Sequence, residues 1–328
     1  MFFHEEPPGT LIEIVKNLYF QETPVNSFYL QKQLRKAGFD VDSRTVRYHL
    51  LNLEKEGKVR RFGRKGVMLT EKGIEEAKII LLSERFGEMT LESEKVFGEC
   101  DYDLNTNEGA VAVNMAVLKE DLLEEALDLL FEVGRKEAVI SPLFAIERGP
   151  KRIKTTIIGE DEVAILVLSS MNYDLIFQRA GVPIESVATG VLSIEKDSIK
   201  GFSEVIIHAG TTISPSELLI RGGYTSVAYY AKTGTGYVMG AIKTFPSVLY
   251  DKVLELIRKI EKSPLKRPLS HGFVLPPRFR FSMSDRHRGY IITFGGANYL
   301  APLVEKGLTK SIKVASASYR VELMMEPS

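Results

Sequence analysis

Cysteine is nearly absent from this chain: Cys100 is the only one among 328 residues. A single cysteine excludes an internal disulfide and a cysteine-rich metal cluster, and it is typical of a reducing compartment. No apolar run approaches the roughly 20 residues that a membrane-spanning helix needs. The first residues also lack a basic stretch followed by an apolar one, which argues against export. We therefore expect a cytoplasmic protein that does not contact a membrane.

Motifs of catalysis and cofactor binding are also missing. The five histidines show no metal-ligand spacing, and none accompanies a serine in a recognised nucleophile motif. The glycine-rich turn Thr233–Gly236 precedes an expected strand instead of opening a helix, so it does not match a dinucleotide-binding motif. These absences predict a protein that is not an enzyme and that holds no metal and no cofactor.

Net charge is absent overall but not locally. The formal charge of the chain is +0, because 43 basic residues balance 43 acidic ones. Between Lys32 and Lys65, however, basic residues far outnumber acidic ones, and the stretches 84–103 and 120–137 are acidic in compensation. A local basic cluster in a neutral protein is typical of a surface that meets phosphate.

The centre of this basic region predicts a recognition helix. Asp42 or Ser43 can cap a helix whose apolar positions Val46, Leu50 and Leu53 recur at helical spacing, with Leu51 one residue over, and Gly57 ends it. Donor side chains on its opposite face would meet base edges and phosphates in a major groove. These candidate DNA contacts are Ser43, Arg44, Thr45, Arg47, Tyr48 and His49.

A basic hairpin follows this helix. Residues 58–70 predict two short strands around a turn at Gly63–Gly66, with Arg61, Arg64 and Lys65 placed to contact the phosphate backbone. A preceding helix from Asn26 or Ser27 completes a winged helix-turn-helix domain over residues 1–84, expected to bind double-stranded operator DNA. Two alternatives stay open: a protein-interaction module, or a basic face that only meets solvent.

The remainder, residues 85–328, contains an internal repeat. Residues 109–119 with their following helix match residues 236–246, and residues 163–174 match 289–300, both at an offset of roughly 127. Each copy, about 95–200 and 225–328, has the order strand, helix, strand, strand, helix, strand, which is the split βαβ, or ferredoxin-like, pattern. We expect an α+β fold in which the two copies pack about a pseudo-two-fold axis.

Two groups of residues are candidate contacts for a small anionic effector. The first is repeated at the start of the second helix of each copy, where unpaired backbone N–H groups favour an anion, although ordinary helix capping would look the same. The second lies in the segment between the copies, where an arginine beside hydroxyls suits a dicarboxylate, although a plain surface loop would look similar. The first group is Ser170, Asn172, Gly295, Gly296 and Asn298, and the second is Thr211, Thr212, Ser214 and Arg221.

With an N-terminal helix-turn-helix, the motif Gly296–Leu300 followed by Glu305–Leu308, and the Pro276–Pro277 step, the chain resembles the archaeal nitrogen-regulatory repressors of the NrpR family. The resemblance implies a homodimeric repressor of nitrogen-assimilation genes that binds palindromic operators and is released by 2-oxoglutarate. Some members carry two regulatory domains, whereas this chain carries one. The residues alone also allow a winged-helix regulator of another metabolite, or a metabolic enzyme domain fused to a DNA-binding module.

Overall fold

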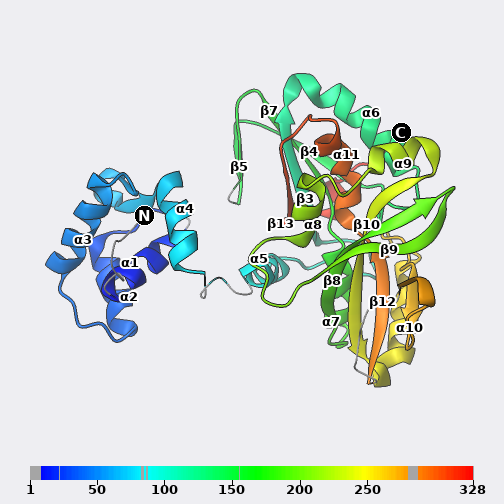
Figure 1. Cartoon of the computed structure of the whole chain (residues 1–328), viewed down its shortest axis with the longest axis horizontal. Helices are drawn as coiled ribbons and strands as arrows, with labels where there is room; N and C mark the ends of the chain where they lie inside the picture. Colours follow the sequence, from blue (N-terminus) through cyan, green and yellow to red (C-terminus); the bar gives the residue numbers. More distant parts are fainter. Residues whose placement is uncertain are drawn as a thin grey trace. The chain divides into compact units, whose positions relative to one another are not determined.

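The chain forms two compact units, Met1–Phe86 and Gly87–Ser328. The computed structural model describes residues 9–21, 23–82, 85, 88–154, 156–279 and 287–327. Figure 1 shows both units, whose positions relative to one another are not determined. We call the first the winged-helix unit and the second the regulatory unit.

The winged-helix unit has the predicted order of elements. Three helices are followed by a short antiparallel hairpin, in which Val59 pairs with Leu69 and Arg61 with Val67, and then by a fourth helix. The expected winged helix-turn-helix is therefore confirmed. Its elements are α1 (Gly9–Tyr19), α2 (Ser27–Lys36), α3 (Ser43–Lys55), β1 (Val59–Arg61), β2 (Val67–Leu69) and α4 (Glu71–Ile80).

Local chemistry explains where α2 and α3 begin and which faces they bury. The side chain of Asn26 accepts a hydrogen bond from Tyr29 N at 2.9 Å, and that of Asp42 accepts one from Thr45 N at 2.7 Å. Each therefore satisfies a backbone donor that the first helical turn leaves free. The apolar faces of α1, α2 and α3 meet in one core that contains Ile14, Val15, Leu18, Leu30, Leu34, Val46, Leu50 and Leu53.

The described part of the regulatory unit contains two large antiparallel sheets, the helices that pack on them, and a separate two-stranded hairpin of β5 and β6 (Figure 1). Its first part comprises α5 (Glu88–Phe97), β3 (Ala110–Lys119), α6 (Leu123–Gly134), β4 (Phe144–Arg148), β5 (Lys151–Ile153), β6 (Thr156–Ile158), β7 (Glu162–Leu168), α7 (Met171–Arg179) and β8 (Glu185–Glu195). The middle part comprises β9 (Ser198–Ile207), α8 (Pro215–Arg221) and α9 (Val227–Thr233). The last part comprises β10 (Gly236–Pro246), α10 (Tyr250–Ile260), β11 (Ser270–Gly272), β12 (Arg288–Phe294), α11 (Ala301–Glu305) and β13 (Ile312–Arg320).

The two copies are present, but they exchange their last strands. One sheet has the order β13-β3-β7-β4, so three strands of the first copy are completed by the last strand of the second. The other has the order β11-β12-β10-β8-β9, so three strands of the second copy are completed by the last strand of the first. The predicted split βαβ pattern is thus realised twice, with each sheet assembled from both halves of the chain. The repeat in the sequence did not indicate this exchange of strands.

In each copy, the second helix and the strand that follows it pass together to the sheet of the other copy. We call the two points where the chain passes between the sheets, next to Ser170 and at Gly296, the crossovers. Tyr173 at the start of α7 donates a hydrogen bond to the carbonyl of Lys266, at 2.6 Å, in the connection that follows α10. In the same way, Tyr299 before α11 donates to the carbonyl of Pro142, at 3.0 Å, in the connection that follows α6. Figure 1 shows α7 beside β8 in the half that holds α10, and α11 in the half that holds α6.

The two crossovers meet at the centre of the unit. A Cβ atom on Gly296 would lie 2.5 Å from Ser170 N and 2.6 Å from Leu168 O, so the two backbones are in direct contact. The fully buried side chain of Asn172 bonds to Ala112 N and O at 2.8 and 2.7 Å, and that of Asn298 bonds to Met239 N and O at 2.8 and 2.9 Å. Each amide therefore supplies the β-type hydrogen bonds that the strand would otherwise lack where the chain leaves its sheet.

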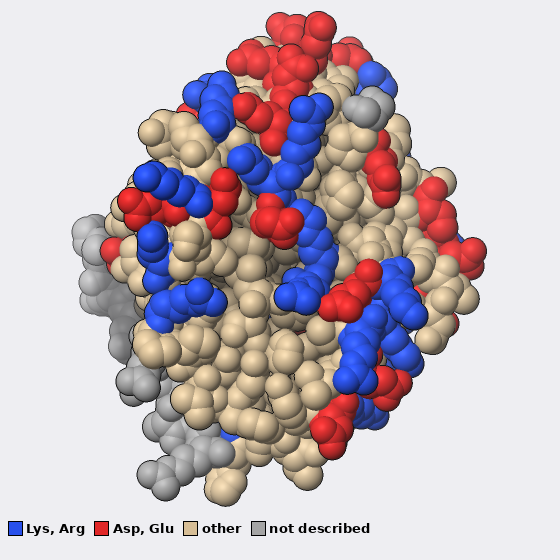
Figure 2. All heavy atoms as spheres, turned by 90° about the vertical axis from the view of Figure 1, so that its right-hand side faces the viewer, with Lys and Arg blue, Asp and Glu red and all other residues tan. Residues whose placement is uncertain are grey.

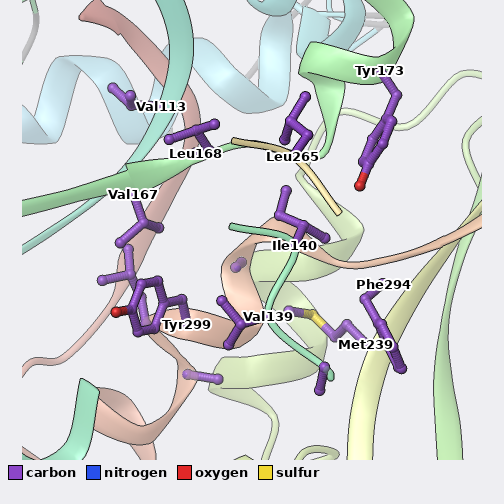
Figure 3. Close-up of a cluster of buried hydrophobic side chains, with 14 of the residues drawn as sticks. Val113, Val139, Ile140, Val167, Leu168, Tyr173, Met239, Leu265, Phe294 and Tyr299 are labelled. Carbon is purple, nitrogen blue, oxygen red and sulfur yellow. The ribbon is translucent and has the colours of Figure 1, made fainter. Parts of the chain in front are cut away.

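A single apolar core joins both sheets around this crossing point. Figure 3 shows side chains of the first copy, among them Val113, Leu168 and Tyr173, around the same centre as Met239 and Phe294 of the second copy. All five are buried and belong to one cluster of contacting residues. Because burial of apolar surface is the main favourable term in folding, the two sheets stabilise one another.

The contact between the crossovers gives a test of the fold. Gly296→Ala would place a methyl group against the backbone of Ser170, and overpacking of this kind typically costs about 1–3 kcal/mol. We expect this loss in the free energy of unfolding of the regulatory unit, measured by denaturant titration. Gly98→Ala is the matched control, because its Cβ would lie at an ordinary 3.5 Å from Lys95 O. Equal stability of the two variants would contradict the crossing as described.

Candidate nucleic-acid interface and candidate effector site

The exposed face of α3 carries most of the predicted DNA contacts. Arg44, Arg47 and Tyr48 are exposed, and Thr45 is half-buried. Arg47 folds back on the first turn, where its Nε donates to Ser43 O and its Nη2 to Ser43 Oγ, both at 3.0 Å. These bonds restrict the arginine and use the Nε–Nη2 edge of its guanidinium, so a contact with DNA would be made by the Nη1 side or after the Ser43 bonds are released. The structure therefore brings Ser43, Arg44, Thr45, Arg47 and Tyr48 to one surface.

Two residues of α3 lie differently from the sequence prediction. His49 is half-buried at the margin of the exposed face, and burial lowers the pKa of its imidazole. Leu51 was expected on the apolar face but is 49% exposed, next to Tyr48. The reason is rotational: at about 100° per residue, Leu51 falls beside Arg44 and Tyr48 and not beside Val46 and Leu50.

The wing presents cations beside this face. Arg64 and Lys65 are exposed in the turn between β1 and β2, as predicted for phosphate contacts. Arg61 differs, because its Nη2 lies 2.8 Å from Glu54 Oε2 and its Nε 3.3 Å from Glu54 Oε1. This bidentate pair ties the wing to the end of α3, and it engages the guanidinium edge that a phosphate would need. Arg61 is thus a positioning residue in this conformation, although it is exposed, as is its neighbour Arg60.

The first candidate effector group is brought together but is buried. Asn172 and Asn298 use both ends of their amides on backbone groups, and both are 0% exposed. Gly295 and Gly296 are buried in the crossing, and Ser170 is half-buried against Gly296. The alternative of ordinary packing fits this geometry, and the group leaves no room for a ligand. We therefore do not retain these five residues as an effector site.

The second candidate group surrounds α8. Thr211 Oγ1 donates to Ile213 O at 2.7 Å and so closes a local turn, and Ser214 Oγ accepts from Glu217 N at 3.4 Å and caps α8. Thr212 is half-buried in the same loop, whereas Arg221 is exposed in the last turn of α8. A seven-residue helix is about 10 Å long, so a ligand of two carboxylates would have to lie along α8 to reach both ends.

A buried polar cluster lies at the base of this loop, and the sequence analysis missed it. Lys243 of β10 is 1% exposed and forms an ion pair with Asp174 of α7. Its Nζ also donates to Ser186 Oγ at 2.6 Å, and Ser186 Oγ donates to Asp174 Oδ1 at 2.9 Å. The signal was a lysine inside the apolar strand Gly236–Pro246, but its partner lies 69 residues away in the chain and could not be inferred from spacing.

His208 joins the cluster to the loop. Its Nδ1 lies 3.1 Å from Ser186 O and its Nε2 2.9 Å from Thr189 Oγ1. A carbonyl only accepts, so Nδ1 carries the proton and Nε2 accepts from the threonine. Burial, and then the charge of Lys243, lower the pKa of His208 to about 4. The ring is therefore neutral at physiological pH.

Charge on the regulatory unit is mixed where it can be seen. Figure 2 shows acidic and basic side chains interspersed over the upper part of one face and a largely uncharged lower part. Among the described residues no group of histidine, cysteine, aspartate and glutamate is placed to hold a metal ion. No described helix has the length and apolar character needed to cross a bilayer.

Comparison with known proteins gives the family. The model of the NrpR regulatory domains NRD1 and 2 matches residues 87–326, which is well over half of the chain. The chain belongs to the NrpR family. A second model, the winged-helix domain of ribonuclease R, matches residues 12–77 and so covers the N-terminal unit.

Individual relatives agree with this membership. The chain is 26% identical over 316 residues to the global nitrogen regulator NrpRI of Methanosarcina mazei, covering 96% of this chain and 97% of that protein. It is 27% identical over 312 residues to the global nitrogen regulator NrpR of Methanocaldococcus jannaschii, covering 95% of this chain but 54% of that protein. It thus spans about half the length of the second relative.

A solved structure resembles the regulatory unit. The crystal structure of a nitrogen repressor-like protein from Methanococcus jannaschii superposes with a TM-score of 0.59 and 20% identity, covering 72% of this chain and 96% of that one. At this identity the likeness concerns the fold. The shared fold extends over about three quarters of this chain.

His208 gives a pH-dependent prediction. Its folded pKa is about 4, below the ordinary 6.5, so the unfolded chain takes up the proton first as pH falls. The contribution that the neutral His208 makes to the free energy of unfolding is therefore fully present above pH 6.5. It is lost between pH 6.5 and 4, at no more than about 1.4 kcal/mol per pH unit. We expect His208→Gln to lack this part of the pH dependence in denaturant titrations. An NMR signal of His208 that titrates near 6.5 would contradict the neutral, buried ring.

Proposed function

We propose that this protein is a transcriptional repressor of nitrogen-assimilation genes, that it binds operator DNA through the winged-helix unit, and that 2-oxoglutarate releases it. The observation that carries the proposal is an exposed face with Arg44 and Arg47 on α3, and Arg64 and Lys65 on the wing, in a chain of the NrpR family. The names of the relatives, which are global nitrogen regulators, support the nitrogen-related role.

The shape of the winged-helix unit favours duplex DNA over a protein partner. A recognition helix enters a major groove with its N-terminal residues toward the bases, and here Arg44 and Arg47 lie in the first two turns of α3. The exposed wing cations come from a separate element, so they would meet the phosphate backbone beside that groove. Cations on two elements at the edges of one face suit two phosphate strands.

We further propose that the protein acts as a homodimer. Two copies would place their recognition helices about one DNA turn, roughly 34 Å, apart on a palindromic operator. The dicarboxylate would contact the segment Thr211–Arg221, with the guanidinium of Arg221 gripping one carboxylate and the hydroxyls of Thr212 and Ser214 serving the other. Thr211 would join them once its hydroxyl releases the carbonyl of Ile213.

The position of α8 offers a route from such a ligand to the whole regulatory unit. Glu217 of α8 accepts a hydrogen bond from Val314 N of β13 at 2.9 Å, and the loop before α8 follows His208, which bonds to residues of β8. β8 and β13 are the two exchanged strands. A shift of α8 would therefore act on both sheets together and change the spacing of the two recognition helices.

The DNA-binding arm of the proposal predicts separable effects. Arg47→Ala should cost about 1–3 kcal/mol of operator affinity, while the double variant Arg64→Ala, Lys65→Ala should weaken binding to every duplex and lower the salt slope by about 2. Fluorescence anisotropy across a salt series measures both. Lys78→Ala, in α4 and paired with Glu75, is the control that should change neither. An unchanged salt slope in the double variant would remove the wing from the interface.

The effector arm predicts reciprocal coupling. 2-Oxoglutarate should weaken operator binding by a factor of about 5–150, and operator DNA should weaken 2-oxoglutarate binding by the same factor. Calorimetry with and without DNA measures both sides. Arg221→Ala should reduce affinity for 2-oxoglutarate and leave DNA binding in its absence unchanged, whereas Arg258→Ala on α10 should change neither affinity. Binding of 2-oxoglutarate that does not alter DNA affinity would rule out the proposed release.

A further inference from the structure

The recognition helix exposes two large apolar side chains that its own core does not explain. Tyr48 is 62% exposed and Leu51 is 49% exposed, while Val46, Leu50 and Leu53 on the other side are nearly or fully buried. Tyr48 and Leu51 are three residues apart, so they are neighbours on the helix surface. Together they form an apolar strip in the middle of the face that meets the solvent.

Cations surround this strip. Arg44 and Arg47 precede it within one turn, Lys55 follows it by one turn, and all three are exposed. An apolar protein partner would leave these charges without counter-ions, whereas a DNA groove has phosphates along both edges. Charge complementarity therefore selects duplex DNA as the occupant of this face.

Within a major groove, the apolar group that DNA presents is the C5-methyl of thymine. Along α3, Tyr48 and Leu51 are separated by about 4.5 Å of helix rise, close to the roughly 3.4 Å between successive bases. The two side chains can thus meet methyl groups on neighbouring base pairs. The phenol ring is also supported from behind, because His49 lies edge-on to it with ring centroids 5.8 Å apart.

We propose that Tyr48 and Leu51 determine part of the operator specificity by packing against thymine methyl groups, so that each half-site requires thymine at one or two adjacent positions. Arg44 and Arg47 supply hydrogen bonds to neighbouring bases or phosphates, and the apolar strip supplies discrimination that hydrogen bonds alone do not give. This inference rests on the proposed DNA-binding function.

The test removes the methyl groups and nothing else. Duplexes that bind the full chain are selected from a random-sequence library, and each thymine of the consensus is replaced in turn by deoxyuridine. We expect one or two positions in each half-site at which loss of the methyl weakens binding about fourfold, the value for one buried methyl group. Thymines outside the half-sites should show no effect.

The protein variants assign the contact. In Tyr48→Ala or Leu51→Ala, thymine and deoxyuridine duplexes should bind equally well at the position that the missing side chain contacts. Phe28→Ala is the matched control, because Phe28 is a 73% exposed aromatic residue of the same unit but on α2, and it should keep the full deoxyuridine effect. Circular dichroism of all three variants checks that the exposed substitutions leave the fold intact.

Each outcome decides the matter. If binding depends on salt but no deoxyuridine substitution weakens it, methyl recognition is overturned and the DNA-binding function is retained. The same conclusion holds if Tyr48→Ala and Leu51→Ala both keep the full deoxyuridine effect of the unaltered protein. Absence of salt-dependent binding to any duplex overturns both. If the α3 variants keep the deoxyuridine effect but lose binding to a partner protein, the strip is a protein contact instead.

Discussion

The architecture of the regulatory unit depends on the contact between its two crossovers. The backbones at Ser170 and Gly296 approach so closely that no side chain fits between them. Only through this crossing can α7 and β8 reach the second sheet and α11 and β13 reach the first. The apolar core in Figure 3 surrounds this crossing, and the paired tyrosine bonds hold the elements that pass through it. The buried amides of Asn172 and Asn298 make the crossing possible, since they satisfy strand groups that would otherwise be left in an apolar interior.

Much of the fold could be predicted because its signals are local. Capping by Asn26 and Asp42, the helical spacing of Val46, Leu50 and Leu53, and the positive φ of Gly63 in the wing all act within a few residues. The internal repeat was equally visible, because two matches share one offset. The exchange of the last strands was not visible. The alternation of apolar and polar residues indicates which face of a strand is buried, but it does not indicate which strand it pairs with. Nothing in the sequence of β8 or of β13 specifies which of the two sheets each strand completes.

The candidate sites show the same limit. Arg44 and Arg47 could be assigned to the exposed face from helical periodicity, but the pairing of Arg61 with Glu54 joins two elements and has no signature in the sequence. Asn172 and Asn298 were assigned to an anion site since asparagine at a helix start looks identical whether it caps, binds a ligand or bonds to a strand. Lys243 is visible in the sequence as a charged residue in an apolar strand. Its role depends on the ion pair with Asp174, which only the folded chain brings near.

The ion pair of Lys243 and Asp174 also makes the two halves unequal. At the repeat offset, Lys243 corresponds to Ala116 and Asp174 corresponds to Leu300, both of them apolar and buried. If α7 and β8 folded onto the first sheet, Asp174 would be placed among apolar residues without its lysine, and breaking such a buried pair costs about 3–5 kcal/mol. The two sheets offer nearly equivalent docking positions for α7 and β8, and the charge of Asp174 distinguishes one position from the other. The pair therefore disfavours an isomer of the same chain in which α7 and β8 dock on the first sheet.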